Sequence, residues 1–309
     1  MAPERIFDGI RVFSIASADG AACADIVPEL GGIVSSLRLV GGRECLFRHK
    51  WFWDPAAPET RGGIPLLFPI CGRLLHDDVP GQYRIGGQSF VMPIHGFAMR
   101  VPWEVADASQ PDSLRLRLAD SPPTRAMFPF AFELELLYAV ASKGFSCRLS
   151  VRNAGDTPMP FYAGFHPYFA TPLPGSGKKH TVFEANPCAR HLYDSTKTRI
   201  VGSAPPPAFP LSVADDAGAG SLLEMGKDHE TRIRFPDGFE IRQAASPVFR
   251  FRQLYTLPEE PFFCDEPWMA PAGSLNRPGG ARLLPPGRSE SGTISIAPGP
   301  FGADQRLQR

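Results

Sequence analysis

The feature that most constrains the fold is an alternation of apolar and polar residues with a period of two, which recurs along the chain. From 130 to 140 every second residue is aromatic or aliphatic, and similar runs cover 114–118, 147–151, 233–235, 249–251 and 294–296. A period of two places the apolar side chains on one face of a strand. No amphipathic pattern runs longer than about two helical turns, and residues 122–129 are the one candidate for a short helix. The 34 prolines and 30 glycines also favour turns over long helices. The sequence therefore predicts an all-β fold built largely from antiparallel strands.

The chain of 309 residues is long enough for one large domain or two ordinary ones. Residues 202–220 have the composition of a linker, being rich in Pro, Gly, Ala and Ser. Strand patterns of the same kind resume after this segment, so we expect a long loop inside a single domain that covers 1–309. Residues 298–309 are polar and are expected to form a frayed tail.

Charge and composition narrow the functional class. Lys and Arg together number 32, as do Asp and Glu, so there is no general electrostatic argument for binding nucleic acid or an anionic membrane. No run of eighteen apolar residues is present that could span a bilayer, and the start of the chain lacks the apolar core of a secretory signal. The six cysteines are scattered without a Cys-x-x-Cys pair, which is typical of reduced, buried thiols in a cytoplasmic protein.

A hairpin between two glycine-flanked bends is the first indication of a site. Gly86 and Gly87 separate two short alternating runs, and a Gly-Gly pair suits a two-residue turn whose central residues have positive φ. A hairpin returns the chain to where it began, so Arg73 and His95 are expected to lie near each other. A cation and an imidazole at such bends suggest a site, although a Gly-flanked histidine is also common in plain loops.

Two further stretches, 161–169 and 262–271, each place one ionisable residue among aromatic ones. These residues are His166 and Glu266, and each is followed by a proline, which favours an extended backbone at the preceding residue. A carboxylate in apolar surroundings has a raised pKa and a histidine titrates near neutrality, so together they could act as base and acid. The alternative is that Glu266 pairs with an arginine and His166 is a hydrogen-bonded core residue. Motifs for a nucleophilic serine, a phosphate loop, a dinucleotide or a metal are absent from the sequence.

Taken together, these motifs resemble the aldose 1-epimerase (galactose mutarotase-like) superfamily. The matching segments, in chain order, are Gly-Gly-Ile-Pro-Leu-Leu-Phe-Pro at 62–69, Gly-Arg at 72–73, His-Gly-Phe-Ala at 95–98, Pro-Trp-Glu-Val at 102–105, Gly-Phe-His-Pro-Tyr-Phe at 164–169, Glu-Pro-Trp at 266–268 and Leu-Pro-Pro-Gly at 284–287. The resemblance covers about residues 9–297. It implies one large antiparallel β-sandwich domain with a sugar-binding cleft, no metal and no organic cofactor.

The resemblance also implies a mechanism. Glu266 would remove the proton from the anomeric hydroxyl, and His166 would protonate the ring oxygen. After ring opening and rotation about the C1–C2 bond, the ring would reclose as the other anomer. His95 would help to bind and polarise the sugar. Asp265 is adjacent to Glu266, but neighbouring side chains of an extended segment face opposite ways, so only one of the two can face the cleft.

Four further residues are expected to contact the substrate on the basis of this resemblance. Arg73 occupies the place of a substrate-contacting arginine, and Arg61 resembles an arginine of the hexose-6-phosphate mutarotases. Trp268 and Tyr168 could offer ring faces to the C–H patches of a sugar. Phe68 and Trp53 could do the same, although core packing is the preferred role for Phe68.

The sequence departs from the family pattern in two places. Many relatives carry arginine directly after His-Gly-x-Ala, whereas this chain has Met99, followed by Arg100. The acidic residue that binds sugar hydroxyls in the galactose enzymes has no clear counterpart, and Asp194 is a candidate. Because Met99 removes a cation, we expect neutral aldoses to be handled at least as well as aldose 6-phosphates.

The leading functional hypothesis is a cofactor-free aldose 1-epimerase, an isomerase that acts on a small sugar. One alternative is a hexose-6-phosphate mutarotase, and another is a non-catalytic sugar-binding protein on the same fold. A site that only binds sugar needs no acid–base pair, so the joint presence of Glu266, His166 and His95 favours an enzyme. The expected partner is the sugar alone, without nucleic acid or membrane, in a monomer or weak homodimer.

Overall fold

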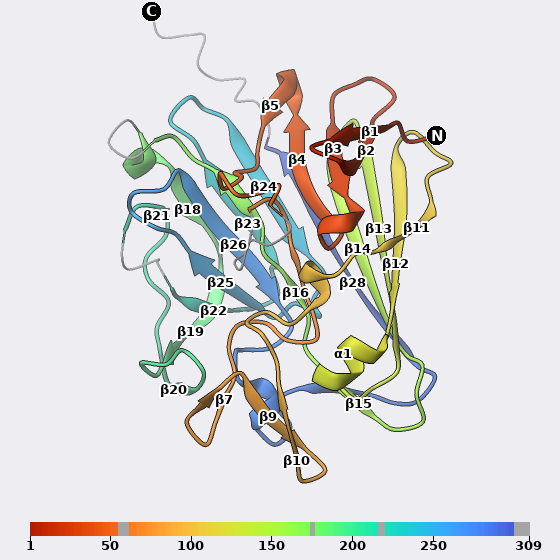
Figure 1. Cartoon of the computed structure of the whole chain (residues 1–309). Coiled ribbons are helices and arrows are strands. Elements are labelled where there is room, and N and C mark those ends of the chain that lie inside the picture. Colours follow the sequence, from red (N-terminus) through yellow and green to blue (C-terminus); the bar gives the residue numbers. More distant parts are fainter. Residues whose placement is uncertain (55–61, 174–176, 216–219, 300–309) are drawn as a thin grey trace, which may run out of the picture.

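Strands account for most of the described chain, as the period-two pattern predicts. The computed structural model describes residues 1–54, 62–173, 177–215 and 220–299 (Figure 1). Within these ranges the one α-helix is α1 (Pro122–Met127), at the position predicted for a short helix. Its start is fixed by a capping box, in which Ser121 N donates to Thr124 Oγ1 at 2.8 Å and Thr124 N donates to Ser121 Oγ at 3.4 Å. Short 3₁₀ turns are η1 (Pro28–Leu30), η2 (Val40–Gly42), η3 (Ala98–Arg100), η4 (Lys178–His180) and η5 (Ser274–Asn276).

The largest sheet has nine antiparallel strands. Their order across the sheet is β11 (Glu104–Asp107), β12 (Ser113–Ala119), β13 (Phe132–Ala141), β14 (Gly144–Asn153), β28 (Ser289–Pro298), β24 (Glu240–Ala245), β23 (Glu230–Arg234), β18 (Val182–Glu184) and β21 (Leu211–Ser212). In β13, buried and half-buried residues alternate along nearly the whole strand. One face of this sheet therefore packs on the core, and the alternation read from the sequence is confirmed.

A second, eight-stranded sheet carries the strand with the predicted glutamate. Its order is β20 (Ile200–Ala204), β19 (Pro187–Tyr193), β22 (Leu222–Met225), β25 (Phe251–Tyr255), β26 (Phe262–Trp268), β16 (Gly164–Phe165) and β6 (Leu66–Leu67), with β17 (Tyr168–Ala170) pairing with β26. All seven residues of β26 are buried, so this strand is covered on both faces. Thr231 and Gln243 of the nine-stranded sheet donate hydrogen bonds to Asp265 of β26, which joins the two sheets.

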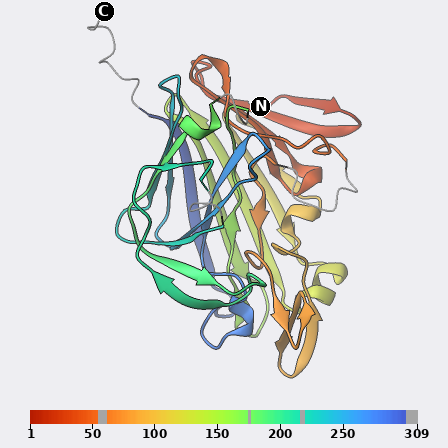
Figure 2. The same ribbon diagram turned by 90° about the vertical axis from the view of Figure 1, so that its left-hand side faces the viewer.

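A five-stranded sheet near the N-terminus and three two-stranded ribbons complete the fold of the described residues. The sheet runs β1 (Glu4–Phe7), β2 (Ile10–Ala16), β3 (Cys23–Val27), β4 (Ile33–Leu39) and β5 (Arg43–Glu44). The ribbons pair β7 (Leu75–His76) with β8 (Val79–Pro80), β9 (Gln82–Ile85) with β10 (Gln88–Val91), and β15 (Met159–Phe161) with β27 (Arg282–Leu284). Figures 1 and 2 place the five-stranded sheet (red) and the β9–β10 hairpin (orange) at opposite ends of the molecule.

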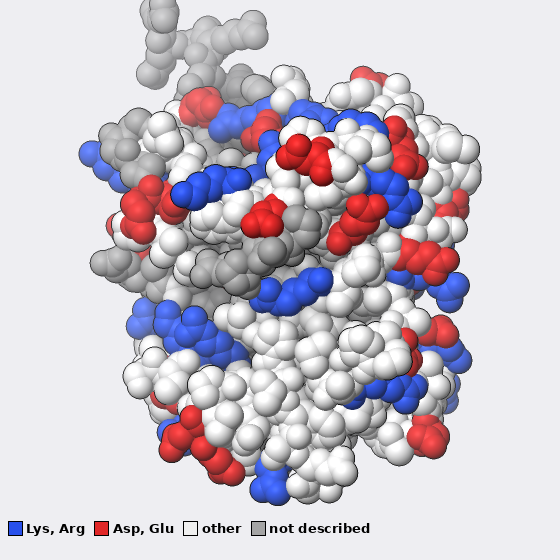
Figure 3. Space-filling view, in the orientation of Figure 1, with Lys and Arg blue, Asp and Glu red and all other residues white. Residues whose placement is uncertain are grey.

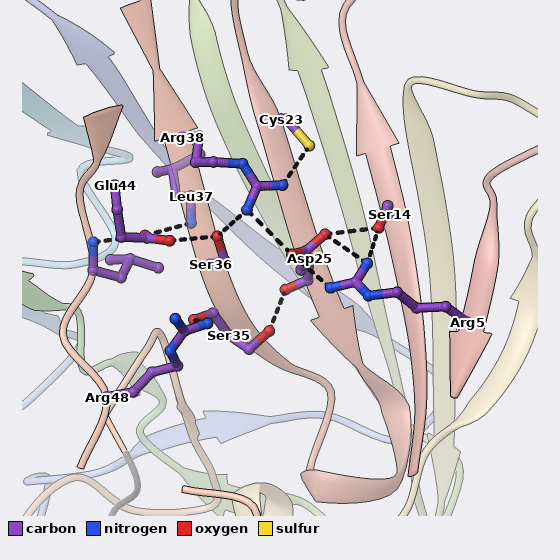
Figure 4. Close-up of polar contacts among 11 residues, drawn as sticks. Arg5, Ser14, Cys23, Asp25, Ser35, Ser36, Leu37, Arg38, Glu44 and Arg48 are labelled. Atoms are coloured by element: carbon purple, nitrogen blue, oxygen red, sulfur yellow. Dashed lines mark hydrogen bonds and ion pairs between the residues drawn. The ribbon is translucent and has the colours of Figure 1, made fainter. Parts of the chain in front are cut away.

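A polar network fastens the strands of the five-stranded sheet to one another (Figure 4). At its centre is the buried carboxylate of Asp25 on β3, which accepts hydrogen bonds from Arg5 Nη2 at 2.9 Å and Ser14 Oγ at 2.7 Å. Arg38 on β4 reaches the same carboxylate at 3.4 Å. A buried carboxylate is costly unless it is paired, and these contacts from three neighbouring strands supply the pairing.

The β9–β10 hairpin forms where the sequence predicts it. Gly86 and Gly87 have φ values of 56° and 84°, as the two-residue turn requires. Tyr83 fastens the ribbon to the helix, because its buried ring packs into the core and its hydroxyl donates to the carbonyl oxygen of Met127 at 2.7 Å. Asn276 holds the base of the ribbon by donating to the carbonyl oxygens of Leu75 and Gln82, both at 3.0 Å.

Two details of the predicted domain organisation need correction. Residues 202–220 are not one continuous loop, because 202–204 belong to β20 and Leu211 and Ser212 form β21. Pro298 is not part of a frayed tail, because it pairs with Ile241 at the end of β28. Residues 300–309 of the predicted tail lie outside the described residues. One apolar core cluster draws residues from Ala2 to Ile296, and the single domain over 1–309 stays a prediction.

Charges of both signs are interspersed on the face of the molecule shown in Figure 3, without a broad area of one sign. Among the described residues, no helix combines the length and apolar character needed to cross a membrane.

Candidate active site

Six of the seven predicted site residues line one cavity of about 320 Å³. This volume lies in the usual range for small-molecule sites, roughly 300–1,000 Å³. The seventh predicted residue, Arg61, lies outside the described residues. The lining consists of Gly72, Arg73, Ile94, His95, Arg100, His166, Tyr168, Tyr193, Lys197, Gly220, Gln253, Tyr255, Glu266, Trp268 and Ala272.

Glu266 points into the cavity from β26. Its neighbour Asp265 points the other way, into the contact between the two sheets, as the strand alternation requires. Glu266 is 1% exposed, and Trp268 Nε1 donates to its Oε2 at 3.1 Å. Its Oε1 lies 3.4 Å from His166 Nε2. Burial raises the pKa of Glu266 well above its ordinary value, because the charged form loses its hydration.

His166 lies between the short strands β16 and β17, where Pro167 follows it. Its ring stacks on the ring of Tyr168 with centroids 4.5 Å apart and an angle of 7°, and the Tyr168 hydroxyl is 3.4 Å from its Nε2. Burial, and then the nearby His95, lower the pKa of His166 well below its ordinary value. Among the described residues, the ionisable partner of Glu266 is His166, at 3.4 Å, so the alternative in which Glu266 pairs with an arginine is wrong.

His95 stands on a bend with left-handed backbone, with φ of 64° at His95 and 76° at Gly96. Glycine is required at 96, because an added Cβ would lie 2.1 Å from the carbonyl oxygen of Phe68. The backbone N–H of Gly72 donates to His95 Nδ1 at 3.0 Å. Since Nδ1 accepts, the neutral ring carries its proton on Nε2.

The electrostatic surroundings keep the His95 ring neutral. Burial, then Arg100 and Arg73, lower its pKa to about 3. Its ring centroid is 5.3 Å from that of His166 and 6.0 Å from that of Trp268. The expectation that the hairpin brings Arg73 close to His95 is confirmed, because both residues line the same cavity.

The aromatic residues proposed from the sequence differ in their placement. Trp268 and Tyr168 line the cavity. One face of the Tyr168 ring is covered by His166, so the hydroxyl is the part best placed to contact a ligand. Phe68 is fully buried in the core, which is the role that the sequence analysis preferred for it. Trp53 packs against Phe7 and Phe52 and is absent from the cavity lining, so its proposed role in the site is wrong.

Two cations of the cavity were not assigned to the site from the sequence. Met99 is buried, and the 3₁₀ turn η3 instead brings the next residue, Arg100, to the cavity wall. Lys197 reaches the wall from the hairpin that connects β19 to β20. Asp194, the candidate for binding sugar hydroxyls, does not line the cavity. Its carboxylate shapes this hairpin by accepting from Thr198 N at 3.1 Å.

Three neutral polar residues were also missed. Gln253 and Tyr255 lie on β25, where Gln253 is directly opposite Glu266 in the strand register. The same-face rule for paired strands would have indicated both residues if the pairing of β25 with β26 had been known. Tyr193 comes from the end of β19, and its hydroxyl accepts a hydrogen bond from Ala272 N at 3.1 Å.

The chain is similar to known proteins in both sequence and structure. A model of the aldose 1-epimerase family matches residues 14–196, which is more than half of the chain. The chain belongs to the aldose 1-epimerase family. The chromosomal and plasmid forms of Protein LacX from Lactococcus lactis subsp. lactis are both 28% identical to it over 148 residues, covering 47% of this chain and 46% of theirs. The chain therefore spans about half the length of the curated relatives it matches.

This family member is also similar to solved structures over nearly its whole length. The Slr1438 protein from Synechocystis sp. PCC 6803 has 27% sequence identity and a TM-score of 0.81, with 96% of this chain and 97% of that one covered. A galactose mutarotase-like protein from Clostridium acetobutylicum has 21% identity and a TM-score of 0.82, with 97% and 98% covered. The second likeness shows the fold alone, and both agree with the predicted sandwich.

Proposed function

We propose that this member of the aldose 1-epimerase family is a mutarotase, which interconverts the α and β anomers of an aldose by acid–base ring opening. The observation that carries the proposal is the buried contact of 3.4 Å between Glu266 Oε1 and His166 Nε2 on the wall of the cavity. A base and an acid at this separation match the two oxygen atoms that the reaction must serve.

The reaction requires two proton transfers at neighbouring atoms. In a cyclic aldose, both the anomeric hydroxyl and the ring oxygen are bonded to C1. Glu266 removes the hydroxyl proton as the bond from C1 to the ring oxygen breaks, and His166 donates a proton to the ring oxygen. The product is the open-chain aldehyde. Rotation about C1–C2 and the reverse transfers then give the other anomer, without net gain or loss of protons.

Burial assists ring opening in this scheme. In its reactive form the pair is carboxylate and imidazolium, and ring opening converts it to carboxylic acid and neutral imidazole, which is the form that burial favours. Because burial raises the pKa of Glu266 and lowers that of His166, it makes the carboxylate a stronger base and the imidazolium a stronger acid. Each acid–base group contributes about 10²–10⁴-fold to the rate in typical enzymes.

Two neighbours orient the reacting groups. Trp268 holds Oε2 of Glu266, which leaves Oε1 on the side of His166. His95 is neutral and has its proton on Nε2, so it can donate a hydrogen bond to a sugar oxygen without competing for the transferred proton. His95 therefore serves to bind and polarise the substrate.

Polarimetry tests this proposal. The optical rotation of a freshly dissolved α-anomer is followed for several aldoses and aldose 6-phosphates, and the uncatalysed rate is subtracted for each sugar. We expect an acceleration proportional to protein concentration for at least one sugar. A Glu259→Gln variant should keep that rate, because it removes an exposed carboxylate absent from the cavity lining. No acceleration with any sugar would instead support a non-catalytic sugar-binding protein.

A further inference from the structure

Tyr193 lines the cavity but takes no part in the proposed proton transfers. Glu266 and His166 act on the anomeric hydroxyl and the ring oxygen, so the other hydroxyl groups of a sugar must be held by the rest of the cavity wall. The ring of Tyr193 is partly buried and packs against the main apolar core. A tyrosine placed in this way has an apolar body and a polar tip that seeks a hydrogen-bond partner.

A β-bulge lies where Tyr193 ends strand β19 in the β19–β20 hairpin (Figure 1). Leu192 is opposite Gly202 in the pairing of these strands, but Tyr193 is opposite Ile200, so Val201 is an extra residue. A bulge of this kind bends the strand and can re-aim a side chain next to an active site. Leu192 is exposed here, whereas Tyr193 lines the cavity.

The cavity receives Tyr193 from this hairpin and not the residue that the sequence suggested. Asp194, the predicted contact to sugar hydroxyls, points into the hairpin. Its carboxylate accepts hydrogen bonds from Thr198 N at 3.1 Å and from Thr196 Oγ1 at 2.9 Å. The hairpin therefore presents a phenol to the cavity at this position, which can donate a hydrogen bond, where a carboxylate could only accept one.

A backbone hydrogen bond leaves the Tyr193 hydroxyl with a proton to donate. Ala272 N donates to the hydroxyl oxygen at 3.1 Å, and among the described residues this is the hydrogen bond that the hydroxyl makes. A phenol whose oxygen accepts still has its own O–H as a donor. Burial raises the pKa of Tyr193 above its ordinary value, because the charged form would lose its hydration, so the hydroxyl stays protonated.

The residue that holds this hydroxyl belongs to the wall that supports the reacting groups. An added Cβ at Gly72 would lie 2.7 Å from Cβ of Ala272 and 3.2 Å from Cη2 of Trp268. Gly72 N also donates to His95 Nδ1, and Trp268 holds the proposed base. The hydroxyl of Tyr193 is therefore tied, through Ala272, to the part of the wall that positions the base and the sugar-polarising histidine.

The hairpin is held against this wall at a second point. An added Cβ at Gly273 would lie 1.9 Å from the carbonyl oxygen of Thr198, so the two backbone segments are in close contact. Gly273 N in turn donates to the carbonyl oxygen of Arg73, another residue of the cavity lining, at 3.0 Å. One anchor lies on each side of the hairpin turn, so the hydroxyl of Tyr193 is fixed in place before a ligand binds. A donor that is already ordered loses little conformational entropy on binding.

We propose that Tyr193 is a specificity-determining residue, whose hydroxyl donates a hydrogen bond to a sugar hydroxyl other than the anomeric one. The inference rests on the proposed mutarotase function, because that function assigns the anomeric hydroxyl and the ring oxygen to Glu266 and His166. The contacted oxygen is therefore bonded to C2, C3, C4 or C6. A sugar that lacks this oxygen leaves a polar group of the site unpaired, and the site discriminates against it.

Monodeoxy sugars test the inference. Anomer exchange is measured by NMR saturation transfer for wild type and Tyr193→Phe with glucose, galactose and the C2, C3, C4 and C6 deoxy forms of whichever parent sugar reacts faster. We expect the variant to lower kcat/KM for the parent sugar roughly threefold to tenfold, which is the usual value of a neutral hydrogen bond. The loss should fall on KM, because the contacted hydroxyl takes no part in proton transfer. One deoxy sugar should react equally with both proteins, which identifies the contacted oxygen.

Tyr83→Phe is the matched control. It also removes the hydroxyl of a tyrosine packed in the core, which donates to the carbonyl oxygen of Met127 at 2.7 Å, but Tyr83 does not line the cavity. The ratios of kcat/KM among the sugars should stay those of the wild type. Tyr193→Phe also leaves Ala272 N without its acceptor. A purely structural effect of that loss would change kcat/KM by the same factor for every sugar.

Two kinds of failure can be told apart. Equal losses for every sugar in Tyr193→Phe, or no loss for any of them, overturn the contact and leave the mutarotase proposal intact. If the wild type turns over no sugar, the mutarotase proposal fails, and calorimetric titration with the same sugars decides the rest. Binding that Tyr193→Phe weakens for the parent sugar but not for one deoxy form retains the contact. Any other pattern, including no binding at all, removes it.

Discussion

The strand that carries the proposed base is fastened from behind by a buried ion pair. The carboxylate of Asp265 is fully buried, and its Oδ2 lies 3.5 Å from Nη1 of the equally buried Arg252. The same oxygen accepts hydrogen bonds from Thr231 and, at 2.7 Å, from Gln243 Nε2, while Arg252 Nη2 donates to the carbonyl oxygen of His229 at 2.6 Å. This cluster joins β25 and β26 to the nine-stranded sheet.

Replacing one residue of this ion pair should destabilise the fold more than replacing both. Arg252→Met leaves a buried carboxylate, and Asp265→Leu leaves a buried guanidinium. Each single change should cost about 3–5 kcal/mol, the usual loss when one partner of a buried pair is removed. The double variant removes both charges and loses a few hydrogen bonds worth about 1 kcal/mol each, so it should cost about 1–3 kcal/mol. The coupling free energy between the two residues should therefore exceed about 2 kcal/mol.

Urea unfolding of the wild type, both single variants and the double variant measures the four free energies of this cycle. Glu133→Gln with Arg152→Met provides a matched cycle on an exposed pair at 3.0 Å, where the coupling should stay below about 1 kcal/mol. If the buried changes are additive, with the double variant as unstable as the two losses summed, the two groups do not act as a compensated pair and the reasoning is wrong.

Three further predictions concern pH and packing. His95 takes up a proton near pH 6.5 in the unfolded chain but only near pH 3 in the folded chain. The free energy of unfolding of the wild type should therefore fall by about 2 kcal/mol between pH 8 and pH 5 because of this residue. Urea unfolding of His95→Asn should lack that loss. Burial raises the pKa of Glu266, so the folded chain retains a proton that the unfolded chain releases above pH 4.5. Glu266→Gln should therefore unfold at a higher urea concentration than the wild type at pH 8. This gain in stability should vanish at pH 4, where the unfolded chain also keeps the proton. Gly72→Ala should lower the free energy of unfolding by about 1–3 kcal/mol more than Gly87→Ala, because both have positive φ but only at 72 would the new Cβ meet Ala272, at 2.7 Å.

The fold was largely accessible from the sequence because long strands repeat their signal. β13 and β14 have ten residues each, so each strand shows several repeats of the period-two pattern. Gly86-Gly87 marks a β-turn that few other residues can form. Strands of two or three residues carry no periodicity. The sequence therefore gave no sign that residues 202–220 contain part of β20 and all of β21.

Site residues in short, recognisable motifs were predicted from the sequence. Site residues whose placement in the cavity depends on the geometry of a turn were missed. Histidine or glutamate before proline, among aromatic residues, indicated His166 and Glu266. The choice between Met99 and Arg100 depends on how a single 3₁₀ turn is oriented, and Lys197 depends on one left-handed residue. Neither property can be read from residue type. The catalytic roles, the cytoplasmic location and the monomer or weak homodimer stay predictions.

The most direct test of the central claim is the rate of anomer exchange in Glu266→Gln. Glutamine keeps the shape of the side chain and can accept the hydrogen bond from Trp268, but it cannot remove a proton. With the uncatalysed rate subtracted, kcat should fall at least ~10²-fold, equivalent to about 2.7 kcal/mol of barrier or more, and circular dichroism should remain that of a folded, strand-rich protein. Exchange close to the wild-type rate in the folded variant would contradict the assignment of Glu266 as the base.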